Sequence, residues 1–235
     1  MSSATKSPGT VVDDSAVGAI AWSNPDNAKV SDNAYATIYL ASGGGTQYSH
    51  YLKATNFGFA IPAGATINGI LVEDECKATN NDATNYVQNA VVRLVKGGTV
   101  QGDTKFDPNF MPLSDAYRSI GSSTDKWGLE LSAGDVNAND FGVVFEATIR
   151  SDSGWPAITG YIDHIRITVY YTVPTYKDGS ATLSALGSLS AQSVKVKLGS
   201  GIMLAQASLS AFGEKASKGF PVQHLAYRKD LLFTG

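Results

Sequence analysis

The stretch Tyr161-Ile162-Asp163-His164-Ile165-Arg166-Ile167-Thr168-Val169-Tyr170-Tyr171 decides the fold class. Apolar and polar residues alternate along it, which is the pattern of a β-strand with one buried face. The expected core face holds Tyr161, Asp163, Ile165, Ile167, Val169 and Tyr171, and the expected solvent face holds His164, Arg166, Thr168 and Tyr170.

Residues 141–150 repeat this alternation. Their expected core side holds Phe141, Val143, Phe145, Ala147 and Ile149, and their expected outer side holds Val144, Glu146, Thr148 and Arg150. Because the two stretches have the same pattern, we expect their strands to pair or to be neighbours. Further strands are expected at 34–40, 50–61, 66–78 and 86–96, where β-branched and aromatic residues are bounded by turn formers.

Turn signals separate these strands, and helix signals are scarce. Pro62 and Gly64 predict a tight turn between two strands, and Lys96-Gly97-Gly98-Thr99 predicts a hairpin because glycine adopts positive φ readily. The stretch from Ser132 to Asp140 predicts at most a short turn of helix. The sequence therefore predicts an all-β fold, an antiparallel β-sandwich or jelly roll, with a C-terminal β-rich extension or arm.

The organisation of the chain changes near residue 174, where aromatic-rich strands give way to small residues. We expect an N-terminal arm and first strand over 1–20, a sandwich domain over 21–173, and an extension with a docking arm over 174–235. Within the extension, Ala181-Thr182-Leu183-Ser184-Ala185-Leu186-Gly187 recurs as Ala207-Ser208-Leu209-Ser210-Ala211-Phe212-Gly213. Two copies are too few for a free-standing solenoid, so this region is expected to lean on another surface.

The amino-acid composition limits the kinds of partner and chemistry that we expect for this chain. Of the 235 residues 17% are charged, the net charge is −3, and the 18 lysines and arginines are scattered, so no basic stripe favours a nucleic-acid partner. The single cysteine, Cys76, excludes an internal disulfide and a cysteine-based zinc cluster. Met1 to Thr10 has no signal-peptide pattern and no long apolar run occurs, so we expect a soluble chain made in the host cytoplasm.

Residues with catalytic potential do not form a recognisable motif. The histidines His50, His164 and His224 stand alone, and Asp163 and His164 would point to opposite faces of a regular strand. No nucleophile elbow, phosphate loop or dinucleotide fingerprint occurs, so we expect no enzyme activity and no cofactor.

Three features leave alternatives open. Glu73 and Glu75 share one face of a predicted strand and could form a hydrolase pair, although a solvated face is favoured, while Asp74 faces the apolar side without an explanation. The oxygen-rich loop 24–33 could hold a structural calcium ion, although ordinary turn formation is favoured. Aromatic residues near turns could form a sugar-stacking platform, although a core or interface role is favoured. They are Trp22, Trp127, Trp155 and Tyr117.

A set of short motifs resembles a β-sandwich module of structural proteins from tailed bacteriophages. The motifs are Ser7-Pro8-Gly9-Thr10, Trp22-Ser23-Asn24-Pro25, residues 59–70 from Phe59 to Ile70, Trp127-Gly128-Leu129, Asp140-Phe141-Gly142-Val143-Val144 and Asp163 to Tyr171. The resemblance covers roughly residues 7–173. It implies a virion component such as a capsid decoration protein, a fibre or a minor tail protein, with no catalytic residues.

The expected function is therefore that of a non-enzymatic capsid decoration (cement) protein, located on the virion. It would bind capsid or other virion proteins and form a homo-oligomer, with a trimer expected by analogy with other symmetric shells. Its arm would bury an interface made of Leu225, Tyr227, Arg228, Leu231, Leu232 and Phe233. The alternative is a carbohydrate-binding or receptor-binding module of a phage tail or fibre, with a glycan as partner. No membrane partner is expected.

Overall fold

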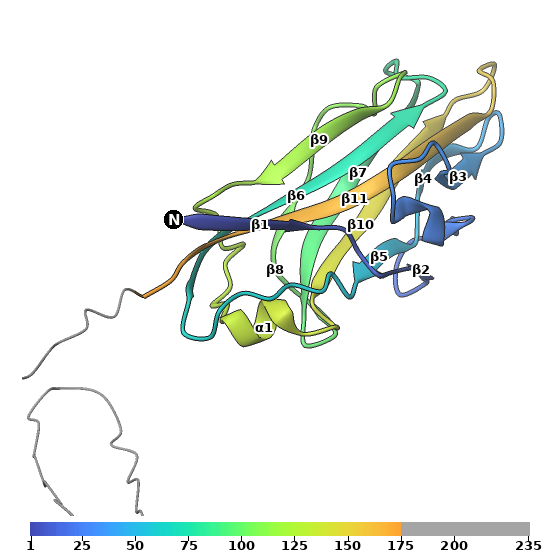
Figure 1. Cartoon of the computed structure of the whole chain (residues 1–235). Coiled ribbons are helices and arrows are strands. Elements are labelled where there is room, and N and C mark those ends of the chain that lie inside the picture. Colours follow the sequence, from blue (N-terminus) through green and yellow to red (C-terminus); the bar gives the residue numbers. More distant parts are fainter. Residues whose placement is uncertain (175–235) are drawn as a thin grey trace, which may run out of the picture. The chain divides into compact units, whose positions relative to one another are not determined.

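Two antiparallel sheets form the described part of the chain, residues 1–174 of a computed structural model (Figure 1). Sheet A contains β1 (Ser2–Lys6), β11 (Ile158–Thr172), β6 (Thr66–Ala78) and β9 (Ala116–Gly121), with β3 (Ala36–Leu40) also beside β11. Sheet B contains β2 (Thr10–Asp14), β5 (Tyr51–Thr55), β10 (Gly142–Ser151), β7 (Asn85–Lys96) and β8 (Thr99–Lys105), with β4 (Gly45–Tyr48) also beside β10. The predicted antiparallel β-sandwich is confirmed.

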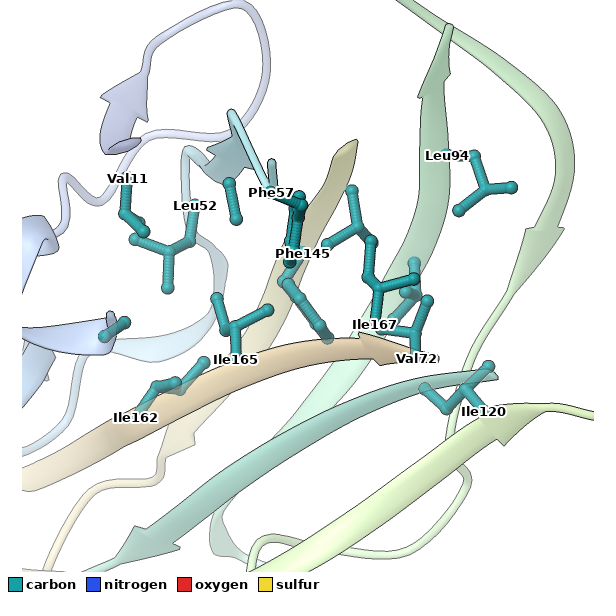
Figure 2. Close-up of a cluster of buried hydrophobic side chains, with 14 of the residues drawn as sticks. Val11, Leu52, Phe57, Val72, Leu94, Ile120, Phe145, Ile162, Ile165 and Ile167 are labelled. Atoms are coloured by element: carbon teal, nitrogen blue, oxygen red, sulfur yellow. The ribbon is translucent and has the colours of Figure 1, made fainter. Parts of the chain in front are cut away.

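Apolar side chains from the two sheets meet between them and form the core. Figure 2 shows Leu52 and Phe145 of sheet B close to Ile165 and Ile167 of sheet A. All four are fully buried. Alternation along each strand sends one set of side chains into this core and the other set to an outer face, so each sheet presents an outer face that can carry a binding site.

Short helices are confined to connections. The 3₁₀-helix η1 covers Pro25–Ala28, and α1 covers Ala133–Asn137. Helix α1 begins with a capping box in which the Ser132 hydroxyl accepts from the Asp135 amide and the Asp135 carboxylate accepts from the Ser132 amide. The prediction of at most one short helical turn before β10 is confirmed.

Several predicted strands and turns have the expected positions. Strand β6 has the predicted bounds, and β7 begins one residue earlier than predicted. Gly97 and Gly98 both have positive φ, at 58° and 74°, in the hairpin between β7 and β8. The predicted strand at 50–61 is too long, because β5 ends at Thr55 and is followed by Asn56 (φ 59°) and Gly58 (φ 62°) in left-handed conformations that an extended strand does not continue.

The prediction that the strands at 141–150 and 161–171 pair or are neighbours is wrong. Strand β10 pairs with β4, β5 and β7 in sheet B, whereas β11 pairs with β1, β3 and β6 in sheet A. The two strands share a pattern because each has one apolar face that needs the core. Two strands can bury such faces by lying side by side in one sheet or by facing each other from two sheets, and β10 and β11 do the latter.

A β-bulge corrects the predicted faces of β11. The register with β6 shifts between Ile162 and His164, so Asp163 is an extra residue and Tyr161 lies on the outer face instead of the core face. Asp163 is nevertheless buried, because its carboxylate accepts hydrogen bonds from the backbone amides of Asp32 and Asn33. A bulge of one residue reverses every side chain before it, which a simple alternation rule does not detect.

The first twenty residues, expected to hold an arm and a first strand, hold two strands, β1 in sheet A and β2 in sheet B. The internal repeat at 181–213 and the predicted arm lie outside the described residues. The same holds for the predicted interface of Leu225, Tyr227, Arg228, Leu231, Leu232 and Phe233. Within residues 1–174, no helix has the length and hydropathy that a membrane-spanning helix requires.

Candidate functional site

The predicted carboxylate pair lies on the outer face of sheet A, as expected, but its two members have different partners. Glu73 accepts two hydrogen bonds from the Arg166 guanidinium, at 2.7 and 2.8 Å. The Arg166 guanidinium also lies 4.0 Å from the centre of the Tyr117 ring. Glu75 pairs across the sheet with Tyr117 of β9. Glu73 is therefore held in a bidentate ion pair that leaves little freedom for acid or base chemistry.

His164 belongs to the same outer face and is almost fully buried. Its Nε2 lies 2.8 Å from Ser7 Oγ, and its Nδ1 lies 2.7 Å from the Tyr117 hydroxyl. Burial and the nearby Arg166 charge lower the pKa of His164. The predicted surface role is therefore wrong for this residue, which ties the segment after β1 to sheet A. His50 contacts Asp13 at 2.8 Å, and His224 lies outside the described residues.

The lowered pKa of His164 predicts a loss of stability in mild acid. The folded state resists protonation of His164 while the unfolded chain accepts a proton near pH 6.5, the ordinary value. Its contribution to the free energy of unfolding should therefore be fully present above pH 6.5 and decline below it. Urea unfolding of wild type and His164→Gln at pH 7.5 and 5.5 measures this. Equal pH dependence in both proteins would contradict it.

Asp74, unexplained by the sequence, forms an ion pair inside the sandwich. It is fully buried, and its carboxylate accepts a hydrogen bond from the Arg118 guanidinium of β9. The amide of Asn89 lies 3.5 Å from the same carboxylate. Burial, and then the charge of Asp74, raises the pKa of the neighbouring thiol of Cys76. The two sheets thus enclose a polar cluster that joins β6, β7 and β9.

The aromatic residues considered for a sugar platform divide into two groups. Trp22 and Trp127 are buried, which confirms the favoured core interpretation for them. Trp155, in the loop between β10 and β11, is 40% exposed, and Tyr117 is 37% exposed but belongs to the His164 network. No single platform unites these four residues in the described structure.

The oxygen-rich loop 24–33 is held by its own hydrogen bonds. Asn24 and Asn33 have positive φ, the Asn27 amide donates to the Tyr35 carbonyl, and the amides of Asp32 and Asn33 donate to Asp163. In residues 1–174, no group of three or more His, Cys, Asp and Glu side chains is placed to hold a metal ion. These contacts give the loop its shape by turn chemistry.

The outer face of sheet B brings together a different set of polar and aromatic residues, which we call the outer strip. Cross-strand register places Tyr48 of β4 and Gln88 of β7 on either side of Thr148 of β10. Tyr51 alternates with the buried Leu52 and so faces outward. The outer strip consists of Tyr48, Tyr51, Tyr86, Gln88, Glu146 and Thr148.

The floor of the outer strip is enclosed by the side chains around it. Val144 and Thr148 point to the outer face, yet they are only 0% and 6% exposed. Lys53 and Arg93 flank Val144 in the cross-strand register, and Tyr48 is 49% exposed at the margin. The longer side chains of neighbouring strands therefore cover Val144 and Thr148, and a ligand on this face would contact those longer side chains.

Glu146 is the polar centre of the outer strip. Burial raises the pKa of its carboxyl group, and no ion pair or hydrogen bond to it is present in the described part of the chain. Burial, followed by the negative charge of Glu146, also raises the pKa of Tyr51. A half-buried carboxylate without a protein partner is an acceptor that a ligand hydroxyl can satisfy.

An aromatic stack closes one end of the outer strip. The rings of Tyr86 and Phe110 are 4.3 Å apart and inclined by 15°. Arg150 lies opposite Tyr86 in the sheet register and forms an ion pair with Asp152 at 2.7 Å. The sequence predicted the outward direction of Glu146, Thr148 and Arg150. It did not reveal the outer strip, because the other residues come from β4, β5 and β7, whose pairing with β10 the alternation pattern does not specify.

The fold and the outer strip define this chain as an antiparallel β-sandwich with a polar, aromatic sheet face. No family model and no curated protein matches its sequence. A solved structure described as "CBM4 structure and function" is similar with 11% identity and a TM-score of 0.33, over 68% of this chain and 94% of that one. The N-terminal cellulose-binding domain of β-1,4-glucanase C from Cellulomonas fimi is similar with 8% identity and a TM-score of 0.31, over 71% and 89%.

A viral structure is also similar. It is the enzymatically active domain of tailspike protein 4 from bacteriophage CBA120, with 7% identity and a TM-score of 0.33 over 68% of this chain. The chain spans 19% of the length of that tailspike structure. At these identities the likeness concerns the fold alone, and the assignment of a function depends on the residues of this chain.

Proposed function

We propose that this chain is a non-catalytic glycan-binding β-sandwich that holds an oligosaccharide on its outer strip. The observation that carries the proposal is the half-buried carboxylate of Glu146, which has no partner among the described residues and lies near Tyr51 of the neighbouring strand β5. Sugars offer hydroxyl groups to polar side chains and the apolar faces of their rings to aromatic ones. A site that combines both kinds of side chain suits them.

The geometry favours a ligand that crosses the strands. Tyr48, Thr148 and Gln88 lie on β4, β10 and β7, so they span two strand spacings, about 10 Å. In this arrangement Glu146 and Gln88 bind hydroxyl groups, and Tyr48 and Tyr51 contact ring faces. Thr148 and Val144 lie beneath these side chains and hold them apart without adding a charge.

Affinity electrophoresis of the full chain tests the proposal. Native gels would contain one polysaccharide each, drawn from plant β-glucans, xylan, galactomannan and bacterial surface polysaccharides. At least one should retard the protein, and Tyr48→Ala and Glu146→Gln should each weaken retention about tenfold, the loss of about 1.4 kcal/mol. Tyr39→Ala is the matched control, because Tyr39 is 60% exposed on the outer face of sheet A.

The Glu146→Gln variant also separates binding from folding. Because burial raises the pKa of Glu146, its ionised form costs folding free energy at neutral pH, and glutamine removes that cost. The variant should therefore unfold at a urea concentration no lower than wild type while it loses retention. Mobility unaffected by every polysaccharide, or equal weakening by Tyr39→Ala and Tyr48→Ala, would refute the outer strip as a glycan site.

The virion setting stays a prediction of the sequence resemblance. Capsid decoration, the expected main function, depended on the arm residues from Leu225 to Phe233, which lie outside the described residues. A phage tail or fibre that recognises a glycan is the setting most compatible with the outer strip. The similar structures include a CBM4 structure and a cellulose-binding domain, but their low similarity adds no support to a glycan site on this chain.

A further inference from the structure

A cavity opens on the side of the sandwich where the two sheets end in β8 and β9. Among the described strands, β8 pairs with β7 and β9 with β6, so each has one free edge there. The cavity measures about 590 Å³, within the range of about 300–1,000 Å³ found for small-molecule sites. Its lining comes from the end of β8, the segment 106–109, β9 and the turn that follows β9.

The charged groups of this cavity are balanced by neighbours. Lys105 forms an ion pair with Asp125 at 2.9 Å, and its ammonium lies 5.2 Å from the centre of the Trp127 ring. Burial alone would raise the pKa of Asp125, but the Lys105 ammonium and the Trp127 amide lower it overall. Lys105 is the cation among the lining residues and is already paired, so a negatively charged ligand would find no free countercharge there and a neutral one is favoured.

Asp107 is an acceptor held in place from two sides. Its Oδ1 accepts hydrogen bonds from the backbone and side-chain nitrogens of Asn109, at 3.0 and 2.8 Å. Its Oδ2 lies 3.9 Å from Nη1 of Arg118, which is beyond a hydrogen bond but within the range of a charge–charge attraction. Asp107 lines the cavity and its side chain is 14% exposed, so this fixed carboxylate can accept from a ligand hydroxyl.

Arg118 is a buried residue directly before the part of β9 that lines the cavity. Its side chain is 8% exposed, and Nε and Nη1 have no hydrogen-bond partner within residues 1–174. The two residues that follow it, Ser119 and Ile120, line the cavity. The Arg118 guanidinium itself is directed to the buried Asp74 and is not part of the lining, so it supports this wall from inside the sandwich.

Phe106 supplies an aromatic wall. It lines the cavity and is 60% exposed, so its ring is accessible to a ligand. An exposed ring beside Asp107, Asn109 and Ser122 combines a flat apolar surface with several hydroxyl-binding groups. We propose that this cavity is a second site, which binds one neutral pyranose unit and does not depend on the outer strip.

Nuclear magnetic resonance of the full chain, labelled with nitrogen-15, tests the second site. The probes are the methyl glycosides of glucose, galactose and mannose, and methyl glucuronide as a charged comparison. At least one neutral glycoside should shift the amide signals of Phe106, Asp107, Asn109 and residues 119–122, with a dissociation constant on the order of 1 mM. Phe106→Ala and Asn109→Ala should weaken this binding about tenfold.

Leu113→Ala is the matched control, because Leu113 is also 60% exposed, follows Phe106 in the same connection and does not line the cavity. It should leave the titration unchanged, as should Tyr48→Ala and Glu146→Gln in the outer strip. Absence of shifts with every neutral glycoside, equal weakening by Leu113→Ala and Phe106→Ala, or equal binding of the glucuronide would overturn the proposal. Loss of binding in the outer-strip variants would also overturn it, because the two sites would then be one.

Discussion

Replacing Arg118 with methionine should lower the free energy of unfolding by about 3–5 kcal/mol, the usual cost of removing one member of a buried ion pair. Asp74 is fully buried, and the variant leaves its carboxylate without the guanidinium that pairs with it. The nearby Asn89 amide, 3.5 Å from Asp74, is too distant to replace that contact. Urea unfolding followed by circular dichroism at pH 7 gives the measurement.

Two further variants show whether the ion pair itself is responsible. The double variant Asp74→Leu with Arg118→Met should recover most of the loss, because apolar residues of similar volume often replace a buried pair without cost. Arg150→Met removes a pair that is about one-third exposed and should change stability little. If the double variant is less stable than Arg118→Met alone, packing of the arginine, and not its charge, stabilises the sandwich.

Replacing Trp127 with alanine should cost about 3–5 kcal/mol, the range for a large aromatic side chain removed from a core. The Trp127 ring is fully buried, and its Nε1 donates a hydrogen bond of 2.9 Å to the Ile70 carbonyl of β6. The variant would leave a cavity and also a buried carbonyl without its donor. The midpoint of urea unfolding, measured against wild type, reports the combined loss.

Trp155→Ala is the control for this change, since Trp155 is 40% exposed in the loop between β10 and β11. Its unfolding midpoint should stay close to that of wild type. Trp127→Phe should retain much of the packing but lose the hydrogen bond to Ile70, and so fall between the two. Equal midpoints for Trp127→Ala and Trp155→Ala would mean that the Trp127 side of the sandwich unfolds separately from the rest.

The two proposed binding sites use different parts of the same architecture. The outer strip depends on register, because Tyr48, Thr148 and Gln88 face one another only when β4, β10 and β7 pair as they do. The cavity depends on two free edges and on the segment that crosses between them, which carries Phe106 and Asp107. Variants in one site should therefore leave the other intact.

Local pattern predicted the strands well. Alternation gave the bounds of β6 and placed Glu146, Thr148 and Arg150 on an outer face, and the glycine pair at 97–98 marked a hairpin. These features depend on neighbours in the chain, because a strand alternates with a period of two residues whatever its partner. The short capped helix before β10 was predictable for the same reason.

Pairing was not predictable in the same way. Both β10 and β11 need a core on one side, and the sequence does not distinguish lying side by side from facing across that core. The bulge at Asp163 reverses Tyr161, and the Asp163 carboxylate is satisfied by the amides of Asp32 and Asn33, which lie far away in the chain. The partner of Asp74, likewise, became visible only when β6 and β9 were side by side.

The sequence by itself determined that this protein is an antiparallel β-sandwich with strands at particular places and with one free cysteine, because alternation and turn chemistry are local. Only the tertiary structure decided which strands share a sheet, which charges are neutralised inside it, and which outer face brings Tyr51 near Glu146. A binding site on a sheet is assembled across strands, and the contacts that align those strands join residues distant in sequence.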